Sequence, residues 1–231
     1  MKFKHDDYQL KDGIYSFIDE NRLTGDNQKY NKLYDKIAWS YNLSQRLYFW
    51  WKYDGEWNFR RPFLNELNIS DDDNVLEIST GTADNFRFLN KNANYVGLDI
   101  SMGMLKQAKK HLKRWGMSST LVHAEGENLP FDDNSFDVVF HCGGINYFND
   151  KKRAIDEMIR VAKPGTKLLI VDETDKLVVE QYQKNMFIKN HYIDAHKALI
   201  PLELIPRNMF DVNSEIICDG LMYKITFYKP L

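Results

Sequence analysis

Cysteine is scarce in this chain, which argues against a disulfide framework. Its 231 residues contain two cysteines, Cys142 and Cys218, so a reducing, cytoplasmic compartment is expected. The chain also lacks an apolar run of the roughly 18 residues that a transmembrane helix needs, so no membrane span is expected. The stretch from Met1 to Asp7 is polar and charged, unlike the apolar core of a signal peptide.

An excess of charge of one sign is missing as well. The chain has 31 Lys and Arg against 33 Asp and Glu, a formal net charge of −2, so a broad basic surface is not indicated. We therefore expect no nucleic-acid partner, although a local basic patch is compatible with this balance. The length suffices for one sizeable core with a smaller cap, and nothing in the sequence indicates an oligomeric state.

Aromatic residues, in contrast, make up 14% of the chain and concentrate between residues 30 and 63. In this region four aromatic or apolar residues recur at helical spacing: Tyr30, Tyr34, Ile37 and Tyr41. The spacing predicts helices over most of the first 70 residues. We expect a helical cap or lid over residues 1–73 and a catalytic domain over residues 74–231.

From residue 75 onward, short apolar runs alternate with amphipathic stretches. Strands are predicted at 75–79, 95–99, 120–123, 136–141 and 167–172, with helices that include 103–115 and 151–161. This alternation predicts an α/β fold with a doubly wound, mostly parallel sheet. Two runs around Asp219-Gly220, at 215–218 and 222–228, predict an antiparallel hairpin that brings the sheet to seven strands. A helical insertion is expected at about 176–199.

Small and polar residues follow four of the predicted strands, where ligands bind in open α/β sheets. The turn of residues 79–83, Ser-Thr-Gly-Thr-Ala, lies between a strand and an expected helix and lets the backbone approach a ligand. Asp99 ends the next strand about 20 residues later, where a carboxylate can bind ribose hydroxyls or cap the following helix, a role for which Ser101 competes. Glu125 and Gly126 either face an adenine edge or form a plain polar loop. Residues 141–146 contain two glycines that permit close approach.

These four segments, in this order, resemble class I S-adenosylmethionine-dependent methyltransferases. Residues 128–139, Asn-Leu-Pro-Phe-Asp-Asp-Asn-Ser-Phe-Asp-Val-Val, and residues 157–165, Glu-Met-Ile-Arg-Val-Ala-Lys-Pro-Gly, are hallmarks of the small-molecule branch. The resemblance covers residues 30–173 and is specific, because several motifs agree in order and spacing. The ubiquinone and menaquinone biosynthesis methyltransferases are similar also in a segment like residues 34–42, Tyr-Asp-Lys-Ile-Ala-Trp-Ser-Tyr-Asn.

The resemblance implies a Rossmann-like methyltransferase fold, S-adenosylmethionine as the cofactor and a small-molecule methyl acceptor, such as a ring-bearing, quinol-like compound. It assigns the methionine part to three residues of the first turn, Glu77, Ser79 and Gly81. It assigns the ribose to Asp99, the faces of the adenine to Ile100 and Met104, and the adenine edge to Glu125 and Gly126. Cys142 would contribute backbone near the sulfonium, and Tyr41 would reach over the methionine end from the cap.

The sequence departs from the family pattern at two places. The turn usually reads Gly-x-Gly-x-Gly, whereas here Ser79 and Ala83 stand at the outer positions. Small residues are kept, so weakened cofactor binding is a more natural consequence than its loss. Glu125 stands where aspartate is commoner, which lengthens the side chain and keeps the hydrogen-bond acceptor.

A general base is needed only where the acceptor must lose a proton. His141, at a strand end beside the cofactor turn, is the candidate among the histidines, although a lone histidine is more often an ordinary polar residue. His191 and His196 are five residues apart, which does not suit one helical face, so no metal site is expected.

Two alternatives stay open. A nicotinamide-dependent oxidoreductase uses the same kind of sheet, but its turn usually reads Gly-x-Gly-x-x-Gly, unlike residues 79–83. A module that binds S-adenosylmethionine without transferring its methyl group is compatible with the substituted turn. The sequence does not indicate the acceptor's identity or whether oxygen, nitrogen or carbon is methylated.

Overall fold

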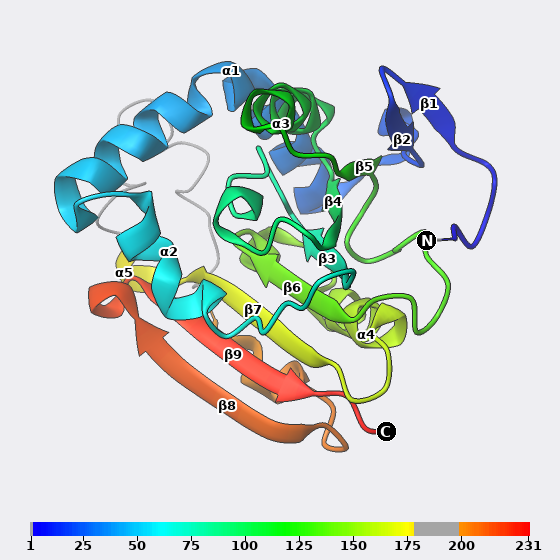
Figure 1. Cartoon of the computed structure of the whole chain (residues 1–231). Coiled ribbons are helices and arrows are strands. Elements are labelled where there is room, and N and C mark those ends of the chain that lie inside the picture. The colour runs from blue at the N-terminus through cyan, green and yellow to red at the C-terminus, as the bar shows by residue number, and fades with distance from the viewer. Residues whose placement is uncertain (1, 178–198) are drawn as a thin grey trace.

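The computed structural model describes residues 2–177 and 199–231, except for the side chains of residues 40–51. Nine strands of the described residues form one sheet in the order β1-β2-β5-β4-β3-β6-β7-β9-β8 (Figure 1). Their bounds are β1 Gln9–Lys11, β2 Ile14–Ser16, β3 Asn74–Ile78, β4 Asn94–Asp99, β5 Thr120–His123, β6 Val138–Cys142, β7 Lys167–Glu173, β8 Phe210–Ile217 and β9 Met222–Tyr228.

The centre of the sheet is parallel and both edges are antiparallel. From β2 through β5, β4, β3 and β6 to β7, each strand runs parallel to its neighbour. Ile78 lies opposite Leu98 on one side and His141 on the other, so the strands end at a common edge. At the two sides of the sheet, β1 pairs with β2, β9 with β7 and β8 with β9, all antiparallel. The predicted doubly wound α/β fold with a C-terminal hairpin is confirmed.

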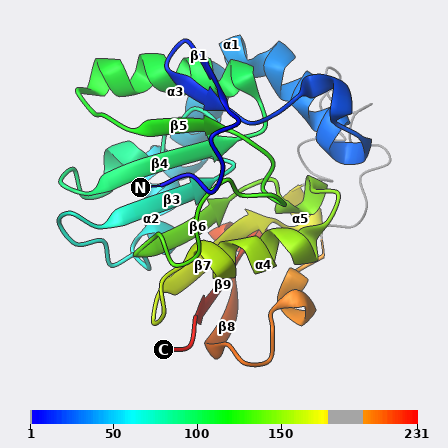
Figure 2. The ribbon, with the colours of Figure 1, turned by 90° about the vertical axis from the view of Figure 1, so that its right-hand side faces the viewer.

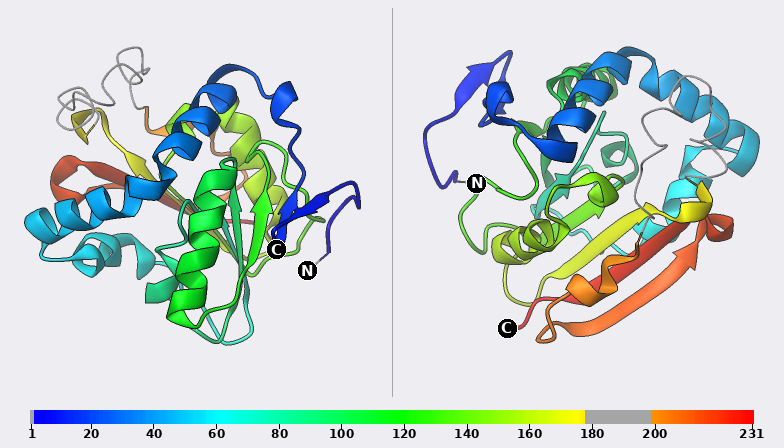
Figure 3. Two further views of the ribbon diagram at one scale, coloured as in Figure 1. Left: turned by 90° about the horizontal axis from the view of Figure 1, so that it is seen from above. Right: turned by 180° about the vertical axis from the view of Figure 1, so that it is seen from behind.

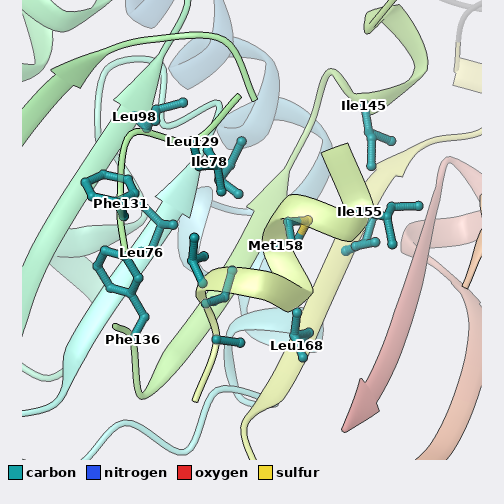
Figure 4. Packing of buried hydrophobic residues seen from close by; sticks show 14 of the residues in the cluster. Leu76, Ile78, Leu98, Leu129, Phe131, Phe136, Ile145, Ile155, Met158 and Leu168 are labelled. Atoms are coloured by element: carbon teal, nitrogen blue, oxygen red, sulfur yellow. The ribbon is translucent and has the colours of Figure 1, made fainter. Parts of the chain in front are cut away.

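Helices cover both faces of this sheet (Figure 2). Val75 packs into a core that includes Phe63 of α2 (Glu56–Leu64) and Leu105 of α3 (Met102–Trp115). The next residue, Leu76, points the other way and packs with Met158 of α4 (Lys151–Val161), as Figure 4 shows. Successive side chains of a strand point to opposite faces, so β3 contributes to both layers of the core.

The helices α3 and α4 begin and end where the sequence signals predict. Ser101 caps α3 by accepting a hydrogen bond from the N–H of Met104 at 3.1 Å, and the helix ends at Gly116, whose φ is 66°. Asp150 caps α4 through the N–H of Arg153 at 2.9 Å. The long helix α1 (Gly25–Tyr53) contacts α3, α2 and η3 (Ile145–Tyr147), and thereby passes over the edge where the parallel strands end (Figure 3).

The structure differs from the local predictions in four places. Residues 9–16 form the hairpin of β1 and β2 instead of a helix, because Asp12 and Gly13 adopt positive φ angles of 53° and 75° and close a tight turn. The helix expected after residue 83 is a short 3-10 turn, η2 (Phe86–Phe88), because Phe86 turns inward against Tyr95 at 4.6 Å between ring centroids. The strand predicted from residue 136 begins at Val138, and the sheet has two strands more than the seven expected.

The expected division into residues 1–73 and 74–231 stays a prediction. Of the helical insertion expected at about 176–199, α5 (Asp175–Leu177) covers the beginning, and most of the remainder lies outside the described residues. No helix within the described ranges has the length and apolar character that a bilayer crossing requires.

Candidate active site

A cavity opens at the carboxyl edge of the parallel strands, beneath α1. It encloses about 850 Å³ of empty space, part of it open to solvent, which is in the range of small-molecule sites. The strands β4, β3, β6 and β7 and the loop after β5 contribute to its wall. The described residues that line it are Asn27, Tyr30, Tyr34, Ile78, Ser79, Gly81, Leu98, Asp99, Ile100, Met104, Ala124, Gly126, Glu127, Cys142, Gly143, Gly144, Tyr147, Phe148 and Glu173.

Asp99 joins the first turn to the end of β4. One carboxylate oxygen, Oδ2, accepts a hydrogen bond from the N–H of Gly81 at 2.7 Å, and the other accepts from the N–H of Ser101 at 2.8 Å. Burial raises the pKa of Asp99 to about 6. The residue that caps α3 is Ser101 and not Asp99. Asp99 lines the cavity instead.

The turn after β3 takes left-handed backbone at all three positions where the family pattern has glycine. The φ angles are 57° at Ser79, 55° at Gly81 and 61° at Ala83. This conformation costs a residue with a side chain on the order of 1–2 kcal/mol, so Ser79 and Ala83 hold a strained path. A Cβ at Gly81 would meet no protein atom within 4 Å, so the backbone angle, and not packing, is what favours glycine there.

Glu77 supports this turn from below without lining the cavity. Its carboxylate accepts hydrogen bonds from Thr80 Oγ1 at 2.7 Å and from Asn85 Nδ2 at 2.5 Å. Arg60 of α2 donates to Asn85 Oδ1 at 2.5 Å, which extends the network to the neighbouring helix. Burial raises the pKa of Glu77 to about 8, so this carboxyl group is mostly protonated at neutral pH.

The loop after β5 brings Glu127, and not Glu125, into the cavity wall. Asn27 of α1 donates its side-chain amide to both carboxylates, to Glu125 at 2.8 Å and to Glu127 at 3.1 Å. Gly126 lines the cavity between them, and a Cβ there would lie 2.6 Å from the ring of Phe148. The adenine-edge role that the resemblance gives to Glu125 stays a prediction, and Glu127 is the carboxylate of this loop that lines the cavity.

A polar row on α1 fastens this helix over the strand ends. Asn27, Asn31 and Asp35 are spaced four residues apart and share one helix face. Asn31 donates to the carbonyl of Ile100 at 2.6 Å, and Asp35 accepts from the Ser101 hydroxyl at 2.5 Å. Sequence analysis missed this row because it followed the apolar spacing of the same helix.

The loop after β6 is held by a buried carboxylate of β7. Asp172 accepts hydrogen bonds from the N–H groups of Gly144 at 3.1 Å, Asn146 at 3.0 Å and Glu173 at 2.8 Å. Asp172 is fully buried, which raises its pKa. This anchoring fixes the turn that presents Cys142 and the following glycines to the cavity.

The end of the cavity at β6 and β7 is aromatic and acidic. The rings of Tyr30 and Tyr147 lie 4.4 Å apart between centroids, and Tyr34 lies 6.4 Å from Tyr30. The hydroxyl of Tyr147 donates to Glu173 Oε2 at 3.3 Å. Tyr30 and Tyr34 were noted for their spacing, whereas Glu173 was missed, because one carboxylate at the end of a strand carries no distinct sequence signal.

The structure does not bring His141 to the cavity. Its ring is fully buried and contacts Phe148 at 5.5 Å between centroids, and burial lowers its pKa to about 3, so it stays neutral. Tyr41 lies on α1, but its side chain is among those that the structure does not describe, as are His191 and His196 as a whole. In the described ranges, no group of three or more His, Cys, Asp or Glu residues is arranged to hold a metal ion.

Comparison with known proteins identifies this fold. Residues 76–170 match the family described as "Methyltransferase domain". A SAM-dependent methyltransferase from Aquifex aeolicus has a TM-score of 0.54 at 17% identity, over 71% of this chain and 86% of that chain. Phosphoethanolamine N-methyltransferase 2 of Haemonchus contortus, with bound S-adenosyl-L-methionine, has a TM-score of 0.67 at 16% identity, over 91% and 61%. The fold is that of the S-adenosylmethionine-dependent methyltransferases, and residues 76–170 match the model of a methyltransferase domain.

Within this class the chain is similar to demethylmenaquinone methyltransferases, as the resemblance in sequence predicted. It is 33% identical to the Thermotoga maritima enzyme over 144 residues, which are 61% of this chain and 60% of the relative. It is 30% identical to the Listeria welshimeri enzyme over 155 residues, 63% of this chain and 62% of the relative. The chain thus matches 60–62% of the length of these relatives. These similarities disfavour the nicotinamide-dependent alternative.

Proposed function

We propose that this chain transfers a methyl group from S-adenosylmethionine to a small-molecule acceptor. The observation that carries the proposal is the contact of Asp99 with the N–H of Gly81 at the floor of a cavity in a methyltransferase fold. The contact brings a carboxylate, which is able to accept hydrogen bonds from ribose hydroxyls, next to a left-handed turn at Gly81. Such a pair at the carboxyl edge of parallel strands is suited to a nucleoside ligand.

The residues of the wall fit the cofactor part by part. Asp99 would hold the ribose, and Ile100 and Met104 would pack on the adenine, whose edge would face Gly126 and Glu127. The methionine part would follow Ser79 and Gly81, with Cys142 and the glycines after it beside the sulfonium, and Tyr41 over it from α1. A cationic sulfonium suits this wall, because its charged residues within the described ranges are the carboxylates Asp99, Glu127 and Glu173. The cofactor supplies an electrophilic methyl group there.

The acceptor that suits this cavity best is a neutral, ring-bearing molecule such as a quinol. Tyr30, Tyr34, Tyr147 and Phe148 offer aromatic faces on which a ring can stack. A phosphorylated acceptor would meet the carboxylates of the wall and be repelled. The relatives named demethylmenaquinone methyltransferases support the same class of acceptor.

Catalysis in such a site consists mainly of alignment and exclusion of water. A methyl sulfonium is already activated, and holding two reactants in line contributes about 7–11 kcal/mol in favourable cases. The α1 helix, fastened by Asn27, Asn31 and Asp35, would cover the cavity as the cap within residues 1–73 and keep water out. A cytoplasmic location accords with free cysteines and stays a prediction.

Two assays test this function. Thermal unfolding with S-adenosylmethionine, its demethylated product or NADH should show stabilisation by the first two and none by NADH. Incubation with S-adenosylmethionine and a panel of phenols, quinols and amines should then yield S-adenosylhomocysteine with the quinols. Stabilisation without turnover on any acceptor would favour a binding module, and stabilisation by NADH alone would contradict the proposal.

A further inference from the structure

Glu173 lies at the opposite end of the cavity from the nucleoside anchor. Asp99 ends β4, and the sheet order places β3 and β6 between β4 and β7, whose last residue is Glu173. Both carboxylates line the same cavity. If the ribose lies on Asp99 and the methionine part follows the turn after β3, the methyl group points toward the ends of β6 and β7. Glu173 then borders the space that the methyl acceptor occupies.

The surroundings of Glu173 fix its position. Its backbone N–H donates to Asp172 at 2.8 Å, and Asn146 Nδ2 donates to its carbonyl at 3.3 Å. Tyr147 Oη donates to its carboxylate at 3.3 Å. The first two bonds hold the backbone N–H and the carbonyl of Glu173. The third holds its carboxylate beside Tyr147, at the aromatic end of the cavity.

Several titratable groups face Glu173 from the elements packed around it. They are Tyr147 of η3, Tyr30 of α1, Asp172 of β7 and Tyr223 of β9, and Asp26 of α1 lies near Tyr30 in turn. Burial raises the pKa of Tyr30, and the charges of Asp26 and Glu173 raise it further. Burial likewise raises the pKa values of Tyr223 and Asp172. Tyr30 and Tyr223 therefore stay neutral at physiological pH and do not compete as proton acceptors.

We propose that Glu173 is the catalytic base, which accepts the hydroxyl proton of a neutral, hydroxyl-bearing aromatic acceptor. The proposal rests on the proposed function. It gives Glu173 the role of general base, for which His141 is the candidate from the sequence. That histidine is buried outside the cavity wall, whereas Glu173 lines it beside three aromatic side chains, Tyr30, Tyr34 and Tyr147.

The proton and electron balance is as follows. The acceptor's O–H bond breaks, its proton goes to the Glu173 carboxylate, and the electron pair stays on the acceptor. That pair forms the new bond to the methyl group while the S–CH₃ bond breaks, and its electrons return to sulfur to give a neutral thioether. Where a ring carbon is the nucleophile, the oxygen's pair forms a C=O bond and a ring π pair bonds the methyl group; the ring then loses its C–H proton, its C–H electron pair restores the aromatic ring, and the oxygen regains a proton. One proton leaves through Glu173 to solvent in each case.

The test compares the variant Glu173→Gln with Glu203→Gln, which removes the same charge from an exposed position in η5 (Pro201–Leu204). The affinity for S-adenosylhomocysteine is measured by calorimetry. The formation of S-adenosylhomocysteine from S-adenosylmethionine is then followed with hydroquinone and 1,4-naphthalenediol from pH 5 to 9. Glu173→Asp, which keeps the charge on a shorter side chain, guards against a loss caused by misfolding alone.

We expect Glu173→Gln to lower kcat by about 100-fold or more, the usual contribution of a general base. Its affinity for S-adenosylhomocysteine should stay within about twofold of the wild type, a difference below about 0.5 kcal/mol. The fall in rate at acidic pH that protonation of Glu173 causes in the wild type should be absent from the variant, whose rate should instead rise across the whole range as the acceptor ionises. Glu173→Asp should recover part of the rate, and Glu203→Gln should match the wild type.

The contrary outcomes are distinguishable. If Glu173→Gln turns over at the wild-type rate with the same pH profile, Glu173 is not the base. If the wild type binds S-adenosylhomocysteine but methylates neither diol, the inferred acceptor class is wrong while the donor half of the proposed function stands. If the wild type does not bind S-adenosylhomocysteine, the proposed function itself fails.

Discussion

Asn31 of α1 donates its side-chain amide to the backbone carbonyl of Ile100 at 2.6 Å, across 69 residues of sequence. The bond ties a helix that precedes the sheet to the loop that follows β4. Asn31 is buried, so its amide depends on this bond, whereas the Ile100 carbonyl also contacts His123 Nε2 at 2.9 Å. The position of the loop next to Asp99 therefore depends on α1.

Substitution of Asn31 should weaken cofactor binding as well as the fold. Asn31→Ala should lower the free energy of unfolding by about 1 kcal/mol, because one hydrogen bond is lost while the Ile100 carbonyl keeps its contact with His123 Nε2 at 2.9 Å. Asn31→Asp should cost more, since a carboxylate would then face a carbonyl oxygen. Urea unfolding and titration with S-adenosylhomocysteine measure both effects. Equal behaviour of the two variants and the wild type would show that α1 is not fastened through this bond.

The turn after β3 offers a matched pair of glycines. Gly81 and Gly116 have φ angles of 55° and 66°, and a Cβ at either would meet no protein atom within 4 Å. Alanine at either position should therefore cost about 1–2 kcal/mol of stability through the backbone angle alone.

The two variants should differ in ligand binding. Gly81 lines the cavity, whereas Gly116 ends α3 outside its wall, so only Gly81→Ala should weaken the affinity for S-adenosylhomocysteine. Calorimetry on both variants makes the comparison. Similar losses of affinity in both would mean that reduced stability, and not the cavity wall, controls binding.

The protonation of Glu77 should make stability depend on pH. Burial raises its pKa from the ordinary 4.5 to about 8 in the folded chain, so the folded state holds this proton more tightly than the unfolded state. Its contribution to stability is complete below pH 4.5 and is lost as the pH rises toward 8.

Comparison of Glu77→Gln with the wild type isolates this contribution. Relative to the variant, the wild type should lose stability on the order of a few kcal/mol between about pH 5 and pH 8. Urea unfolding at both pH values measures the difference, with Glu203→Gln as a control at an exposed site. Parallel curves for the wild type and Glu77→Gln would contradict a raised pKa at Glu77.

The sheet could be predicted from the sequence because its strands are buried on both faces and separated by amphipathic helices. Strands such as β7, which reads Leu-Leu-Ile-Val over residues 168–171, are continuous apolar runs, and α3 and α4 carry caps at Ser101 and Asp150. The hairpin of β1 and β2 could not be predicted, because three-residue strands are too short to establish a period. Their place in the sheet depends on pairing with β5, far along the chain.

The site was predictable where a motif fixes the backbone and not where tertiary packing selects a side chain. Asp99 and Gly81 follow from strand ends and turn chemistry, and the structure brings them into contact. Glu127, and not Glu125, lines the cavity, and this depends on how Asn27 of α1 contacts the loop. No local sequence pattern encodes that contact. The position of Glu173 relative to Asp99 depends on the order of the strands, which is a property of the whole sheet.

The most direct test of the account is calorimetric titration of S-adenosylhomocysteine into the wild type and Asp99→Asn. The account predicts saturable 1:1 binding by the wild type and a loss of about 10-fold or more in the variant, because a bond to a charged acceptor contributes about 1.5–3 kcal/mol. Thermal unfolding of both proteins checks that the variant is folded. Absence of binding by the folded wild type, or equal affinity in a folded Asp99→Asn variant, would contradict the central claim.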